Sequence, residues 1–68
     1  MERFVVMDDK TKNILLDTAE TPGVNAWDFA YQQIKNHPEY DVFIDVYVDG
    51  VYSHWVDSES IVSEREVR

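Results

Sequence analysis

Hydrophobic and polar residues alternate most strictly between Tyr40 and Val56. Successive side chains of an extended strand point to opposite faces, so this pattern predicts a strand with one apolar face. The apolar face carries Val42, Ile44, Val46 and Val48. The opposite face carries Asp41, Phe43, Asp45, Tyr47 and Asp49. Asp49-Gly50 then tolerates the two positive φ angles of a type I′ turn, which predicts a tight hairpin with a two-residue loop.

A two-residue loop determines which residues of the two strands face each other. On the inner side, toward the core, we expect Val48 opposite Val51, Val46 opposite Ser53 and Ile44 opposite Trp55. On the outer side we expect Tyr47 opposite Tyr52, Asp45 opposite His54 and Phe43 opposite Val56. Trp55 is therefore expected in the core, and His54 is expected to face Asp45.

A second hairpin is predicted near the start of the chain. Residues 3–7 are rich in β-branched and aromatic side chains, which favour a strand. The polar run at residues 8–13 is typical of a turn, and residues 14–16 form a short second strand. A loop of about four residues connects these strands most simply, although the pattern leaves their register open.

A helix is predicted from about Asn25 to Asn36, with a start nearer Pro22 as the alternative. Asn25 is a suitable N-cap, and Asp28 adds a carboxylate near the positive end of the helix dipole. Pro38 disfavours the helical conformation of His37, so the helix should end there. Apolar residues recur at the i, i+3, i+4, i+7 spacing, which places one face of the helix on the sheet. That face carries Ala26, Trp27, Phe29, Ala30, Tyr31 and Ile34.

The chain after Val56 has a weaker pattern. Residues 57–60 resemble a turn, residues 61–63 either extend the sheet edge or pack loosely, and residues 64–68 form a charged tail expected to fray. The predicted order is therefore strand, strand, helix, strand, strand (ββαββ). This is an α+β fold, with an antiparallel sheet and one helix on one face. All 68 residues form a single domain with a thin core.

The charge balance narrows the possible partners. The chain has 14 acidic against 6 basic residues, a net charge of -8, and no Lys or Arg occurs between Asn36 and Glu64. Surfaces that bind phosphates need Lys and Arg, so direct binding to nucleic acid or to an anionic membrane is disfavoured. A basic protein surface is the favoured partner, and charge used only for solubility is the alternative.

The sequence predicts no catalytic, metal or cofactor site, and the absence of cysteine excludes thiol chemistry. His54 opposite Asp45 is more simply a surface pair than a general base. Ser53 and His54 are expected to point to opposite faces of a strand, which argues against a nucleophile and base pair. Asp41, Asp45 and Asp49 follow each other at about 13 Å, too far apart for a glycosidase pair. A non-enzymatic protein is expected.

The start of the chain lacks the basic leader and apolar run of a secretory signal. No apolar run approaches the roughly 18 residues that cross a bilayer. A soluble, cytoplasmic protein is therefore expected.

The outer side of the predicted hairpin is the candidate binding surface. One helix covers only one face of a small sheet, so aromatic side chains remain exposed among carboxylates, as at interfaces with basic partners. The candidate residues are Asp41, Phe43, Asp45, Tyr47, Asp49, Tyr52 and His54. Two alternatives remain open. In the first, the face is buried against the C-terminal segment or in a homodimer. In the second, the face imitates a nucleic-acid backbone as a DNA mimic does, because carboxylates spaced at about 13 Å approximate every second phosphate of a strand.

In size, acidity, lack of cysteine and layout, the whole chain is similar to small proteins with which bacteriophages and other mobile elements inhibit host nucleases, polymerases or defence complexes. The resemblance rests on no motif and transfers no residue. It implies an inhibitor that blocks a basic, nucleic-acid-binding surface of a larger partner in the host cytoplasm. A structural or homodimerisation module with a self-buried aromatic face is the alternative function.

Overall fold

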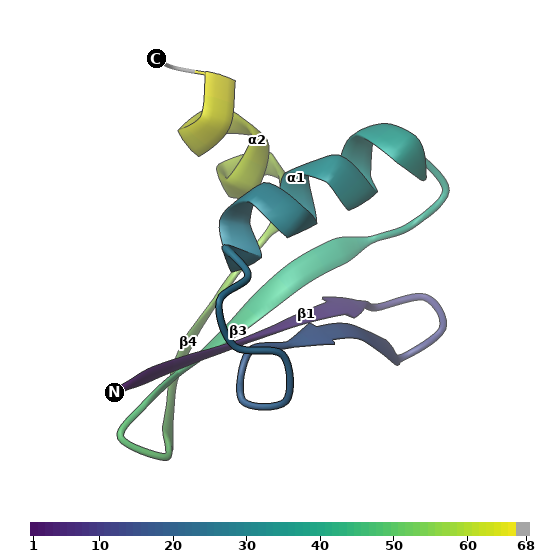
Figure 1. Ribbon diagram of the computed structural model, residues 1–68. Coiled ribbons are helices and arrows are strands. Elements are labelled where there is room, and N and C mark those ends of the chain that lie inside the picture. Colours follow the sequence, from purple (N-terminus) through teal and green to yellow (C-terminus); the bar gives the residue numbers. More distant parts are fainter. Residues whose placement is uncertain (67–68) are drawn as a thin grey trace.

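The computed structural model describes residues 1–66, which form a four-stranded sheet and two helices (Figure 1). The elements are β1 (Glu2–Asp8), β2 (Asn13–Asp17), α1 (Ala26–Asn36), β3 (Val42–Val48), β4 (Val51–Val56) and α2 (Ser58–Glu66). The strand order is β2-β1-β3-β4, and all neighbouring strands are antiparallel. The predicted α+β class and antiparallel sheet are confirmed, whereas the prediction of a single helix is wrong.

The β1–β2 hairpin has the expected four-residue loop, at residues 9–12, with Asp8 paired to Asn13. Asp8 is only 1% exposed, and its carboxylate holds this loop in place. It accepts hydrogen bonds from the backbone N–H of Lys10, the hydroxyl of Thr11 and the backbone N–H of Asp41. These bonds, with that from Asp41 the largest contribution, lower the pKa of Asp8. The loop is thereby fixed to the start of β3.

Helix α1 begins and ends where the sequence predicts. The Asn25 side chain accepts hydrogen bonds from the backbone N–H groups of Trp27 and Asp28, which satisfies two donors of the first turn. The helix ends at Asn36, before His37 and Pro38.

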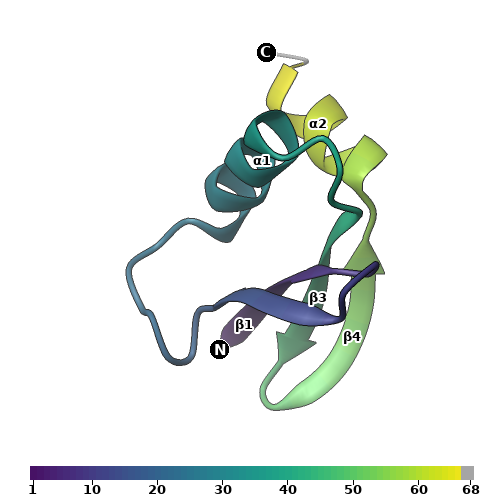
Figure 2. The same cartoon turned by 90° about the vertical axis from the view of Figure 1, so that its right-hand side faces the viewer.

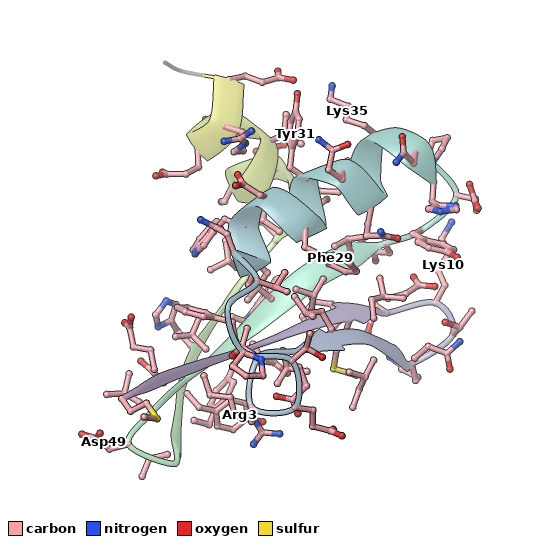
Figure 3. The ribbon with its side chains drawn as sticks, in the orientation of Figure 1. Arg3, Lys10, Phe29, Tyr31, Lys35 and Asp49 are labelled. Carbon is pink, nitrogen blue, oxygen red and sulfur yellow. The ribbon has the colours of Figure 1, made fainter. Side chains whose placement is uncertain are left out.

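Both helices lie on the same side of the sheet, so the molecule has two layers (Figure 2). Figure 3 shows Phe29 directed from α1 toward the strands. The buried cluster between the layers combines residues of β1, β2, β3 and both helices. It consists of Val6, Leu16, Ala26, Ala30, Val42, Ile44, Val46 and Ile61.

The β3–β4 turn is the predicted one, because φ is 51° at Asp49 and 83° at Gly50. Val48 pairs with Val51 and Tyr47 pairs with Tyr52, as expected. The register then shifts, and Ser53 is the extra residue of a β-bulge. Beyond the bulge every pair moves by one residue, so the predicted partners of residues 53–56 are wrong.

The shifted register turns the following side chains to the opposite faces. His54 pairs with Val46 instead of Asp45, and Val56 takes the place opposite Ile44 that was predicted for Trp55. Trp55 instead pairs with Asp45 and is 58% exposed. The expected core position of Trp55 and the expected contact of His54 with Asp45 are therefore both wrong.

Helix α2 replaces the turn and loose segment predicted after Val56. The Asp57 carboxylate accepts a hydrogen bond from the backbone N–H of Ser60, which caps the first turn. Ile61 is completely buried in the core cluster. Residues 64–66, predicted to fray, form the last part of this helix, and residues 67–68 of that prediction lie outside the described residues.

Polar contacts attach the end of α2 to α1. The Tyr31 hydroxyl donates to the Glu66 carboxylate at 2.8 Å, and Lys35 pairs with the same carboxylate at 3.0 Å. Arg65 pairs with Asp28 of α1 at 2.8 Å. Figure 3 shows Tyr31 and Lys35 on the side of α1 away from the sheet. The contacts made by Glu66 therefore lie above the core rather than within it.

Candidate functional site: the outer face of the sheet

The outer face is the sheet surface turned away from α1 and α2. Its side chains alternate along each strand with those of the core. They are Arg3, Val5 and Met7 of β1, Ile14 and Asp17 of β2, Phe43, Asp45 and Tyr47 of β3, and Tyr52 and Trp55 of β4. Tyr52 and Trp55 are 50% and 58% exposed, so no other part of residues 1–66 covers this face at β4.

Aromatic rings on β3 and β4 contact each other across the strands. The Phe43 and Trp55 rings meet edge to face, with centroids 6.3 Å apart and an interplanar angle of 88°. The Tyr47 and Tyr52 rings meet similarly, at 5.7 Å and 74°. Such pairs contribute about 0.5 to 1.5 kcal/mol beyond the apolar area that they bury. The exposed aromatic surface is therefore built from two mutually stabilising cross-strand pairs.

Two carboxylates flank Val5 in one cross-strand row of the outer face, and the first of them has a partner. Asp17 is paired with Val5 on the β2 side and is only 6% exposed. Its carboxylate accepts two hydrogen bonds from the Arg3 guanidinium, from Nε at 2.9 Å and from Nη2. The Arg3 guanidinium also lies over the Tyr47 ring, 5.3 Å from its centroid. The hydrogen bonds from Arg3 lower the pKa of Asp17.

Asp45 is the second carboxylate of this row, and it has no such partner. Its cross-strand neighbours are Val5 and Trp55, and Phe43 and Tyr47 precede and follow it on the same face of β3. Within residues 1–66 its carboxylate makes neither a hydrogen bond nor an ion pair. Burial among these apolar groups raises the pKa of Asp45. The structure thus holds a half-buried, unpaired carboxyl group in the middle of an aromatic surface.

An open depression of about 450 Å³ lies beside Asp45. The aromatic side chains that line it are Phe43, Tyr52 and Trp55. The carboxylates that line it are Asp9, Asp41, Asp45 and Asp57. Asp9 pairs with Lys12 and Asp57 caps α2, whereas the carboxylates of Asp41 and Asp45 have no donor within residues 1–66. None of the lining residues is basic, so the depression combines ring surfaces with negative charge.

The seven candidate residues separate into four places. The depression brings together Asp41, Phe43, Asp45 and Tyr52. Tyr47 lies next to it, between Tyr52 and Arg3. Asp49 lies in the β3–β4 turn, where its carboxylate pairs with the amino group of Met1, and His54 has left the outer face because of the bulge.

The sequence analysis missed Trp55 and Arg3, which contact the candidate residues Phe43 and Tyr47 on this face. Trp55 was assigned to the core because no local signal marks the bulge at Ser53. Arg3 could have been found from the sequence, because it precedes Phe4, which packs against the core, and therefore had to lie on the outer side.

The bulge also brings Ser53 and His54 together, contrary to the sequence expectation. The Ser53 hydroxyl and His54 Nδ1 are 2.9 Å apart. Both residues are exposed on the edge strand, and no acidic group within residues 1–66 contacts the imidazole. The pair therefore lacks the third group that orients the base in known nucleophile triads.

In the described part of the chain, no three His, Cys, Asp or Glu side chains are grouped so that they could hold a metal ion. No helix formed by residues 1–66 has the length and apolar character needed to cross a membrane. No protein-family model matches the chain, and no curated protein or solved structure is significantly similar to it.

Proposed function

We propose that this protein is a small, non-enzymatic binding protein whose outer face blocks a basic, nucleic-acid-binding surface of a larger protein. The observation that carries the proposal is the exposed aromatic surface around the unpaired carboxylates of Asp41 and Asp45. Aromatic anchors supply buried area at protein interfaces, and charges at the rim steer the encounter.

The distribution of charge supports a basic partner. Four basic side chains already pair with acidic groups of the same chain: Arg3, Lys12, Lys35 and Arg65. The net charge of -8 therefore resides in carboxylates that these internal pairs do not neutralise. A cluster of Arg and Lys that normally binds phosphates is complementary to such a surface. In this proposal the carboxylates occupy the place of the phosphates, whether or not their spacing mimics that of DNA.

Site-specific crosslinking tests the proposal. A photoreactive phenylalanine analogue replaces Tyr52 on the outer face, and in a matched control the same analogue replaces Gln32, which is exposed on α1. We expect the analogue at position 52, but not at position 32, to crosslink to a basic segment of a nucleic-acid-binding protein. The purified partner should then lose nucleic-acid binding when this protein is added.

Two results would contradict the proposal. Equal crosslinking from positions 52 and 32 would show that the outer face is not the binding surface. Crosslinks from position 52 to a second copy of the chain would support the homodimerisation module instead. Sedimentation equilibrium at low and high ionic strength separates these cases. A homodimer held together by its aromatic faces should persist at high salt, whereas the proposed binding protein should be monomeric in the absence of its partner.

A further inference from the structure

We infer that the depression beside Asp45 receives the side chain of one arginine from the partner protein, with its guanidinium on the Asp45 carboxylate and against the ring of Trp55 or Phe43. This inference rests on the proposed function and names the group that the outer face recognises. It commits to a protein arginine rather than to a free cation or a lysine.

The chain itself contains the arrangement that the inference requires. Beside Val5, the Arg3 guanidinium of β1 binds the Asp17 carboxylate of β2 and lies over the Tyr47 ring of β3. On the β3–β4 side, Asp45 takes the place of Asp17 and Trp55 offers the aromatic surface, but no residue within 1–66 supplies the cation. Arg3 therefore pairs with Asp17, whereas Asp45 lacks a cationic partner.

Guanidinium fits this depression better than ammonium. It is planar, donates two parallel hydrogen bonds to one carboxylate, and stacks on aromatic rings. It is also more weakly hydrated than ammonium, so it enters a partly apolar depression more readily. The Asp41 carboxylate at the same depression adds attraction without a competing internal donor. Burial in the absence of a cation raises the pKa of Asp45, which is consistent with a carboxylate that an incoming cation would stabilise.

The test is an NMR titration of the full chain with N-acetyl-arginine amide, its lysine counterpart and an oligo-arginine peptide. The two indole N–H signals give an internal comparison, since Trp55 lies on the outer face and Trp27 lies on α1. We expect the arginine amide to shift the Trp55 signal selectively and to bind more tightly than the lysine amide. Asp45→Asn should weaken binding about tenfold, whereas Glu20→Gln, which removes one charge at an exposed site beyond β2, should change it by less than about twofold.

Each alternative result has a distinct meaning. If the oligo-arginine peptide binds but Asp45→Asn and Glu20→Gln weaken it equally, the arginine site is overturned while binding to a basic partner stands. Equal shifts of the Trp55 and Trp27 signals would also overturn the arginine site, while binding to a basic partner stands. If no arginine compound binds even at low ionic strength, both the arginine site and the proposed function are overturned. A Trp55 signal that changes with protein concentration alone would show that a second copy occupies the face, which also overturns both.

Discussion

The burial of Ile61 gives the clearest test of the fold, because the sequence predicted a loose segment at this place. Ile61→Ala removes three carbon atoms from a fully buried side chain on α2. At about 0.8 kcal/mol for each buried carbon the transfer loss is about 2.5 kcal/mol, and the cavity left behind brings the total to roughly 3 to 5 kcal/mol. The unfolding free energy of a domain of this size is near the lower end of the usual 5 to 15 kcal/mol. The substitution should therefore remove about half of it or more.

Thermal unfolding followed by circular dichroism measures this loss. In so small a domain, about 2.5 kcal/mol lowers Tm by roughly 10 to 20 °C. Ile14→Ala is the matched control, because it removes the same atoms from a side chain that is 59% exposed, and it should cost less than about 1 kcal/mol. An Ile61→Ala protein that melts with the wild type, or an Ile14→Ala protein that loses as much, would refute the packing of α2 on the core.

Three further predictions concern the turn and the acidic residues. Gly50→Ala should lower the unfolding free energy, measured in urea, by about 1 kcal/mol, and Gly50→Asn should lower it by less. Open space surrounds this position, so only its φ of 83° opposes a side chain. Equal losses for the two variants would contradict this reasoning. Asp45→Asn should raise Tm at pH 7 more than Glu20→Gln does, because it removes a carboxylate whose ionisation is disfavoured by burial. This gain in Tm should shrink as the pH falls and Asp45 of the wild type becomes protonated. A Tm below that of the wild type would contradict the view that Asp45 is buried without a partner. The unfolding free energy of the wild type should fall as the pH drops below about 4. The pKa values of Asp8 and Asp17 are lowered in the folded state, so the folded state binds protons less tightly than the unfolded state. Urea titrations from neutral to acidic pH that show no such fall would contradict this.

The sequence predicted the local features that single residues determine. Asn25 and Pro38 mark the ends of α1, and the tolerance of Asp49 and Gly50 for positive φ selects the β3–β4 turn. In each case one side chain or one backbone preference decides the conformation without help from distant parts of the chain.

The errors arose where distant packing decides. An Asp-Gly turn specifies only the pairs beside it, and the segment from Ser53 to Val56 has no alternation strong enough to reveal a bulge. Ile61 of α2 and Ile44 belong to the same buried cluster, and Val56, which pairs with Ile44, packs against that cluster. Helix α2 itself was missed because Ile61 is its only buried residue, and its remaining attachment to α1 is polar. Asp57 as an N-cap was the available signal.

The central claim is tested most directly by association and dissociation rates with the partner that crosslinking identifies, measured over a range of ionic strengths. Replacing Asp41 and Asp49, which are both exposed, together by Asn should slow association and flatten its dependence on salt, since exposed charges act mainly on the encounter. Tyr47→Ala and Tyr52→Ala should instead speed dissociation about fivefold or more, because buried aromatic anchors hold the complex. If both sets of variants bind and dissociate at wild-type rates, the outer face is not the binding surface.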